Sequence, residues 1–136
     1  MFKAISSAPA NEVVLAFWNF KNRFNESFHI EKAFLKKDST DNVVDYLLED
    51  GEKLNVGGLP SFWMPVPKME DFKEIKDDLS NVPLYENVLI RFDDGCIENA
   101  VFEKNEETND VYYILFDGET LNKNPTSFMK LELPKL

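Results

Sequence analysis

Few residues of this chain could carry out nucleophilic or acid-base chemistry. His29 is the only histidine and Cys96 the only cysteine. A catalytic cysteine needs a nearby base and an orienting carboxylate, and nothing in the order of the chain places these two residues together. The P-loop, GxGxxG, GxSxG and HExxH signatures do not occur in the sequence. We therefore expect a protein that is not an enzyme and that holds neither a metal nor another cofactor.

Carboxylates are abundant, and one carboxylate motif occurs twice. The motif is Asp-Gly-Glu-x-Leu-Asn, and its two copies could line a pair of related cation or ligand sites. The residues concerned are Asp50, Glu52 and Asn55, and Asp117, Glu119 and Asn122. Tight turns explain the same residues, since Asp-Gly accepts positive φ and Asn caps the next bend. A small-ligand or cation-binding module is therefore the alternative function.

The charge of the chain restricts its partners. The 136 residues include 25 Asp and Glu against 15 Lys and Arg, which gives a net charge of −10. Such a surface repels phosphate backbones and anionic membranes but attracts basic proteins. A single cysteine excludes an internal disulfide and fits a reducing compartment. No signal sequence and no long apolar run is evident, so we expect a soluble, cytoplasmic protein that binds neither nucleic acid nor membranes.

The positions of these residues follow from an internal repeat. Residues 30–55 align without a gap with residues 97–122, at a constant shift of 67, and half of the 26 positions are identical. Upstream, residues 11–17 match residues 86–92 at a shift of 75, and downstream residues 60–64 match residues 125–129 at a shift of 65. The identical residues in the gap-free part are Ile30, Glu31, Ala33, Lys37, Asn42, Val44, Tyr46, Leu48, Asp50, Gly51, Glu52, Leu54 and Asn55.

Within each copy the apolar residues alternate with period 2, which is typical of half-buried strands. One predicted core face carries Val44, Tyr46 and Leu48, which correspond to Val111, Tyr113 and Leu115. A second carries Val13, Leu15 and Phe17, which correspond to Val88, Ile90 and Phe92. Asp-Gly pairs mark the turns between strands. We expect a mostly β protein made of two tandem four-stranded antiparallel meanders, each a small barrel-like unit.

A short helix is expected between the two units. Met69, Phe72, Ile75 and Leu79 recur at helical spacing, and Glu70 and Asp71 would lie in the first turn, where the helix dipole favours them. The expected organisation is a first β repeat over residues 1–67, a helical linker over 68–82 and a second β repeat over 83–136.

Positions where the two copies differ are the candidates for function. The first copy has an insertion over residues 18–29, which mixes aromatic and basic side chains of the kind found at protein-binding hot spots. A long hairpin whose aromatics return to the core is the alternative. Trp63, in Ser61–Pro67, belongs either to a polyproline-like ligand or, as we prefer, to an edge strand blunted by proline. The candidates in the insertion are Trp18, Phe20, Lys21, Arg23 and Phe24.

The third strand of each copy also differs on the face that the copies do not share. That face carries Val43, Asp45, Leu47 and Glu49 in the first copy, and Asp110, Tyr112, Ile114 and Phe116 in the second. A face that has become apolar is either buried against the other unit or presented to a partner, which includes a second copy of the chain. Asp45, Glu49, Asp110 and Tyr112 complete the predicted protein-binding residues.

The order of these motifs resembles a family of small phage and prophage domains of unknown function that end in a Trp-Met-Pro-x-Pro signature. The matching stretches are SAPANEVVLAF, GGLPSFWMPVP and, in the second copy, VPLYENVLIRFDDG. The second copy lacks the tryptophan and both prolines. The resemblance implies a phage or prophage origin and no particular activity.

Together, acidity and this resemblance favour one function. We expect an acidic protein-binding protein, specifically a phage-encoded inhibitor of a host defence nuclease or of a CRISPR effector complex. Its carboxylates would take the place of phosphates on a basic nucleic-acid-binding surface of that host protein.

Overall fold

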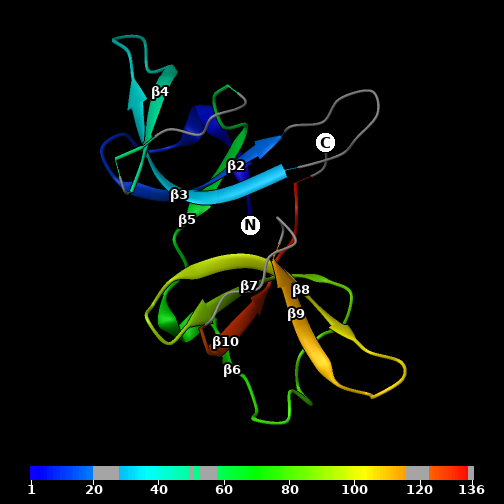
Figure 1. Cartoon of the computed structure of the whole chain (residues 1–136). Coiled ribbons are helices and arrows are strands. Elements are labelled where there is room, and N and C mark those ends of the chain that lie inside the picture. Colours follow the sequence, from blue (N-terminus) through cyan, green and yellow to red (C-terminus); the bar gives the residue numbers. More distant parts are fainter. Residues whose placement is uncertain (20–27, 50, 53–57, 116–122, 135–136) are drawn as a thin grey trace. The chain divides into compact units, whose positions relative to one another are not determined.

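The structure is a computed structural model that describes residues 1–19, 28–49, 51–52, 58–115 and 123–134. It is mostly β and forms two five-stranded antiparallel sheets (Figure 1). In the first sheet the order is β1-β5-β2-β3-β4, and in the second it is β6-β10-β7-β8-β9. The strands are β1 Lys3–Ala4, β2 Val13–Asn19, β3 Phe28–Lys37, β4 Val43–Leu48, β5 Phe62–Pro65, β6 Lys73–Glu74, β7 Asn87–Phe92, β8 Ile97–Lys104, β9 Val111–Leu115 and β10 Pro125–Lys130.

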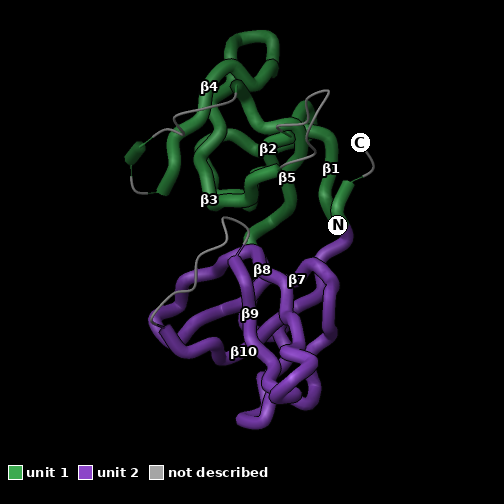
Figure 2. Tube along the Cα trace, turned by 45° about the vertical axis from the view of Figure 1, so that its right-hand side comes forward, with its two compact units in different colours: residues 1–66, 133–136 green, residues 67–132 purple. Residues whose placement is uncertain are grey.

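The chain divides into two compact units, one around each sheet (Figure 2). Unit 1 contains residues 1–66 and 133–136, and unit 2 contains residues 67–132. The segment expected to be a separate linker, 68–82, is thus part of unit 2. Among the residues that the structure describes, no helix has the length and apolar character needed to cross a membrane.

The prediction of four-stranded meanders is wrong in one respect, because each sheet has a fifth, very short strand. β1 pairs with β5 through Lys3 opposite Trp63, and β6 pairs with β10 through Lys73 opposite Phe128. Two residues are too few to show an alternating apolar pattern. β5 consequently lies between β1 and β2 rather than at an edge of the sheet, which corrects the edge-strand interpretation of the segment around Trp63.

The expected linker helix is also absent, because its residues pair with a strand instead. Only one 3-10 turn, η2 (Met69–Asp71), forms, and Asp71 Oδ2 accepts the backbone N–H of Lys68 at 2.8 Å. Immediately afterwards, β6 joins the sheet, and Ile75 N–H donates to the carbonyl of Thr126 at 3.0 Å. Pairing with β10 therefore overrides the local helical spacing of apolar residues.

Unit 1 begins in a similar way, with the 3-10 turn η1 (Ile5–Ser7) after β1. The motif Phe-Lys-x-Ile occurs at residues 2–5 and again at 72–75, a shift of 70. The duplication thus includes the fifth strand of each sheet, and the repeated motif was visible in the sequence.

The shift between β2 and β7 is 74 rather than 75. Ala33 pairs with Val14 in the first sheet, and its equivalent Ala100 pairs with Val88 in the second. A slip of one residue moves every side chain to the other face of a strand. The face of β2 that joins the core cluster shared by the strands of unit 1 therefore carries Val14, Ala16 and Trp18, whereas Leu15 and Phe17 are buried on the opposite face and Val13 is only partly buried.

The two cores match at this corrected register. Ala16 and Trp18 of unit 1 occupy the places of Ile90 and Phe92 in unit 2. The smaller Ala16 is thus combined with the larger Trp18 in unit 1, and the larger Ile90 with the smaller Phe92 in unit 2, which keeps the total volume similar. The equivalent buried pairs are Val14 and Val88, Ala16 and Ile90, Trp18 and Phe92, Ala33 and Ala100, Leu35 and Phe102, Leu48 and Leu115, and Trp63 and Phe128.

The predicted core face of the third strand of the first repeat, β4, is correct except at one position. Tyr46 and Leu48 are buried, but Val44 is 52% exposed. An irregularity between Lys36 and Lys37 shifts the β3–β4 register by one residue, so that Val43 packs against the core instead. In unit 2 the register stays regular, and Val111 packs against the core as expected.

Candidate functional site

Negative charge is distributed unequally between the two units. Unit 2 contains seven Lys and Arg against sixteen Asp and Glu, a net charge of −9, whereas unit 1 contains eight against nine, a net charge of −1. These two values add up to the −10 of the whole chain. Sequence reasoning had treated the acidity as a property of the entire protein. The excess negative charge, and any electrostatic attraction that it exerts, therefore belongs almost wholly to unit 2.

The β8–β9 hairpin holds several of these carboxylates in exposed positions. Its turn is fixed by the side chain of Asn105, whose Oδ1 accepts the N–H of Glu107 at 2.9 Å, and by the N–H of Asn105, which donates to the carbonyl of Asp110 at 2.8 Å. Asn109 adopts a φ of 62°, which asparagine tolerates well. Glu106, Glu107 and Asp110 are exposed as a result.

Two exposed tyrosines lie beside this turn. Tyr112 on β9 is 43% exposed and is the cross-strand partner of Glu103. Tyr85 is 61% exposed, its N–H donates to the carbonyl of Phe102, and its hydroxyl lies 3.4 Å from the carbonyl of Lys104. Tyrosine is enriched at binding hot spots. We call Tyr85, Glu103, Glu106, Glu107, Asp110 and Tyr112 the acidic hairpin surface.

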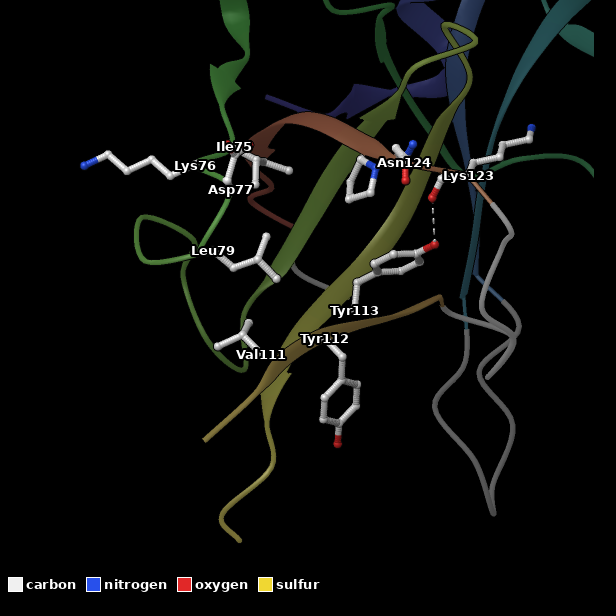
Figure 3. Close-up of a pocket in the computed structure, with 10 residues that line it drawn as sticks. Ile75, Lys76, Asp77, Leu79, Val111, Tyr112, Tyr113, Lys123 and Asn124 are labelled. Carbon is white, nitrogen blue, oxygen red and sulfur yellow. Dashed lines mark hydrogen bonds between the residues drawn. The ribbon is translucent and has the colours of Figure 1, made fainter. Parts of the chain in front are cut away.

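A groove of about 720 Å³ runs along the other side of β9 (Figure 3). Its apolar wall consists of Ile75, Leu79 and Val111, together with Tyr113 and Pro125. In Figure 3 the side chain of Lys76 extends away from Leu79 and Val111, and the ring of Tyr112 points away from that of Tyr113. The volume lies within the range of small-ligand pockets.

Lys123, which lines one end of the groove, forms an ion pair with Asp94, which does not line it. Lys123 Nζ lies 2.6 Å from Asp94 Oδ2 and 3.5 Å from the Cys96 sulfur. The hydrogen bond from Lys123, followed by that from the Cys96 N–H, lowers the pKa of Asp94 to about 2. The hydrogen bond to Asp94 in turn raises the pKa of Lys123. Gly95, with a φ of 86°, closes the tight turn that holds Asp94 in place.

We expect the Asp94 carboxyl to titrate with a midpoint near 2 in a ¹³C NMR titration. Since folding lowers this pKa, the ion pair contributes its full stabilisation at pH values above the ordinary pKa of 3.8. That stabilisation is lost as the pH falls through about 2. Lys123→Met should raise the midpoint towards the ordinary value, because it removes the largest cause. Asp38, whose pKa is lowered by hydrogen bonds from Asn42 and Thr40, is the control. An unchanged Asp94 midpoint in the variant would contradict this assignment.

Both tryptophans predicted to bind a partner are buried in the core of unit 1. Trp18 is 1% exposed, and its Nε1–H donates to the carbonyl of Gly58 at 3.1 Å. Trp63 is 8% exposed, its Nε1–H donates to Ser7 Oγ at 2.9 Å, and the ammonium group of Lys3 lies over its ring. Neither ring is accessible to a partner. The alternative in which the aromatics of the insertion return to the core thus holds for Trp18.

The remaining predicted residues fall into three groups. Phe20, Lys21, Arg23 and Phe24 lie outside the described residues, and so do most residues of the duplicated Asp-Gly-Glu turns. Asp45 accepts the N–H of Tyr46, and Glu49 lies 3.7 Å from Lys32, so both belong to unit 1. Asp110, in the turn before β9, and Tyr112, on β9, are both exposed and belong to the acidic hairpin surface.

The two residues considered for nucleophilic chemistry have other contacts. His29 Nε2 lies 3.0 Å from Glu31 in unit 1, whereas exposed Cys96 lies in the β7–β8 turn of unit 2. Within the described parts of the chain, no group of three or more His, Cys, Asp or Glu side chains could hold a metal ion.

Sequence reasoning missed the groove and Tyr85. The Leu79 part of the groove lies in a stretch between β6 and β7 that is four residues longer than its counterpart, because the shift between the copies rises from 70 at Ile5 to 74 at Pro9, which matches Pro83. Leu79, in that stretch, adopts a φ of 57°, whereas Tyr85 lies beyond it and shares its positive φ with its repeat equivalent Asn11, at 60° and 63°. Aligning the Phe-Lys-x-Ile motif would have revealed this insertion.

Comparison with known proteins adds no family or function to these observations. No protein-family model, no curated protein and no solved structure matches the chain.

Proposed function

We propose that this chain is a non-enzymatic protein-binding protein whose acidic unit 2 covers a basic, nucleic-acid-binding surface of its partner. The unequal charge carries the proposal, since unit 2 has a net charge of −9 and unit 1 of only −1. Carboxylates on a folded β scaffold can occupy positions that phosphates would take on such a partner.

The acidic hairpin surface supplies the contacts in this proposal. Glu106, Glu107 and Asp110 are exposed on a turn fixed by hydrogen bonds to the Asn105 side chain and between backbone groups, so their backbone loses little freedom on binding. Tyr85 and Tyr112 add apolar contact area beside them. Long-range attraction would speed association at low salt and weaken as salt screens it.

In the most specific form of the proposal, the partner is a defence nuclease or CRISPR effector complex of a bacterial host, and the chain is a phage-encoded inhibitor. This form depends on the resemblance of its proline-rich and tryptophan-containing motifs to small phage domains. CRISPR effectors hold nucleic acid in positively charged channels, which an acidic protein of this size could block.

Competition with DNA tests the proposal. The immobilised chain should capture nucleic-acid-binding proteins from a bacterial lysate at low salt, and an added DNA duplex should release them. Glu106→Gln combined with Glu107→Gln and Asp110→Asn should lower the captured amount by about tenfold, since each buried charge contact contributes about 1 kcal/mol or more.

The matched control neutralises three carboxylates of unit 1, with Glu12→Gln, Glu31→Gln and Asp41→Asn. It changes the net charge equally and should leave capture nearly unchanged. Equal losses in both variants would contradict a localised surface. Capture that survives excess DNA in the parent chain would refute competition for a nucleic-acid-binding surface.

A further inference from the structure

A second pocket of unit 2 lies beside the pairing of β6 with β10 and has a volume of about 490 Å³. This volume is within the range of small-ligand pockets. Its apolar lining includes Val82 and Phe128, which belong to the core of the unit. Lys73 on β6 is the cross-strand partner of Phe128, is exposed, and also lines the pocket. We call this site the Lys73 pocket.

The duplication shows what the equivalent residues surround in unit 1. Lys3 pairs with Trp63 at the same place where Lys73 pairs with Phe128. The ammonium group of Lys3 lies 5.2 Å from the centre of the Trp63 ring, and the Nε1–H of that ring donates to Ser7 Oγ at 2.9 Å. Unit 1 therefore holds an indole ring of its own under this lysine.

Two differences between the copies open this position in unit 2. Phe128 carries a smaller ring than Trp63. The stretch between β6 and β7 is four residues longer than its counterpart, and Ser80 within it lines the pocket. Val82 is larger than Ala8, its equivalent at a shift of 74, yet the pocket remains beside it. Unit 2 thus has room for an outside ring next to the equivalent lysine.

The charged residues of the pocket favour a neutral ligand. Lys130 and Asp71 also line it, but Lys130 Nζ lies 3.6 Å from Glu86 Oε2, and Asp71 Oδ2 accepts the N–H of Lys68 at 2.8 Å. Lys73 is the lysine whose equivalent lies over a ring in unit 1. An ammonium group is attracted to the face of an aromatic ring, most strongly to that of indole. The ring of a ligand, and not its charge, would thus be recognised.

The polar wall of the pocket offers one acceptor for a ring N–H. Asn81 is already satisfied, because its Oδ1 accepts the N–H of Lys76 at 3.0 Å and its Nδ2 donates to the carbonyl of Glu74 at 2.7 Å. Ser80 beside it is exposed, and its hydroxyl oxygen can accept a hydrogen bond. Ser7 has this role towards the indole ring of unit 1.

From these observations we infer that the Lys73 pocket binds a small neutral aromatic molecule of the size of indole. The ring of this ligand lies under the ammonium group of Lys73 and against Val82 and Phe128, and its N–H points towards Ser80. The inference goes beyond the proposed function and does not depend on it, because it needs neither a protein partner nor the negative charge of unit 2.

Titration with indole tests the inference directly. Indole is the probe because it is neutral, so that the net charge of unit 2 does not affect its binding. Amide ¹H–¹⁵N NMR spectra of the whole chain should show saturable shifts with a Kd of about 1 mM or lower. These shifts should centre on residues 71–73, 80–82 and 128–130. No saturable shifts, or shifts centred on Val111 and Tyr113 in the other groove, would overturn the inference.

The duplication supplies a variant that fills the pocket. Phe128→Trp combined with Val82→Ala copies the residues of unit 1, so the chain's own indole ring should take the place of the ligand and raise the Kd about tenfold or more. The matched control is Phe102→Leu, which copies Leu35 at a core position that does not line the pocket. It should change the Kd less than about twofold. Circular dichroism establishes that each variant is folded.

An exposed residue gives a second test that does not disturb the core. Lys73→Gln should raise the Kd about two- to fivefold, because it removes the ammonium group over the ring. Lys76→Gln changes the net charge equally at an exposed lysine of the other groove, and it should leave the Kd unchanged. Equal effects of these two substitutions, or of the double variant and Phe102→Leu, would refute binding in the Lys73 pocket.

Discussion

Replacement of Trp18 by alanine should lower the free energy of unfolding of unit 1 by about 3 to 5 kcal/mol. The ring is 1% exposed, packs edge-on against Tyr46 with centroids 5.1 Å apart, and donates a hydrogen bond to Gly58. The substitution removes all of these contacts and leaves a cavity. Urea unfolding followed by fluorescence measures the effect, because Trp63, the remaining tryptophan, is also in unit 1.

A second substitution at this position serves as the control. Phe92 occupies the place of Trp18 in unit 2, so Trp18→Phe should be accommodated with a loss of only about 1 to 2 kcal/mol, mainly from the hydrogen bond and the smaller ring. A cost below about 1 kcal/mol for Trp18→Ala would instead indicate an exposed residue. That result would restore the interpretation of Trp18 as part of a binding surface.

The repeated core was predictable because its residues recur at a constant spacing. Ala33 and Ala100 are both fully buried, and Leu48 and Leu115 are equally buried, in sheets with the same strand order. The turns were also predictable where glycine is required. Gly51 and Gly95 both have positive φ, and each donates its N–H across a turn.

The register of β2 was not predictable from the pattern of apolar residues. Residues 14–18 are all buried, so both faces of this strand are apolar and period 2 gives no preference between them. Pairing with β3 decides the register. β6 was missed for a related reason, since two residues show no period and their position depends on β10.

The candidate site was less predictable than the fold. Tyr112 was predicted because its face differs between the two copies, but nothing in the sequence distinguishes Tyr85, which only its exposure of 61% identifies. Trp18 and Trp63 have the composition of a binding site but lie in the core. Residue type alone could not separate these two classes, because aromatic side chains serve both roles.

The corrected register makes a second large prediction, at Phe17. Its ring is fully buried on the face opposite Trp18 and lies 5.2 Å from that of Phe28, with Phe2 and Phe62 packed edge-on against it. Phe17→Ala should cost about 3 to 5 kcal/mol in the unfolding of unit 1, measured by tryptophan fluorescence in urea.

The comparison at the equivalent position of unit 2 makes this prediction specific. At a shift of 74, Phe17 corresponds to Arg91, which is partly exposed, so Arg91→Ala should cost less than about 1 kcal/mol by circular dichroism in urea. At a shift of 75 the equivalent would be Phe92, and the two copies would keep phenylalanine in one structural position.

If Phe17→Ala and Phe92→Ala are both costly, that result alone does not separate the two registers, because both rings are buried. Phe17→Arg should unfold unit 1, although unit 2 carries arginine at the equivalent position, and a folded variant would contradict the burial of this ring. The reason for the unfolding is that three aromatic rings surround this position in unit 1, and a buried charge among them has no partner.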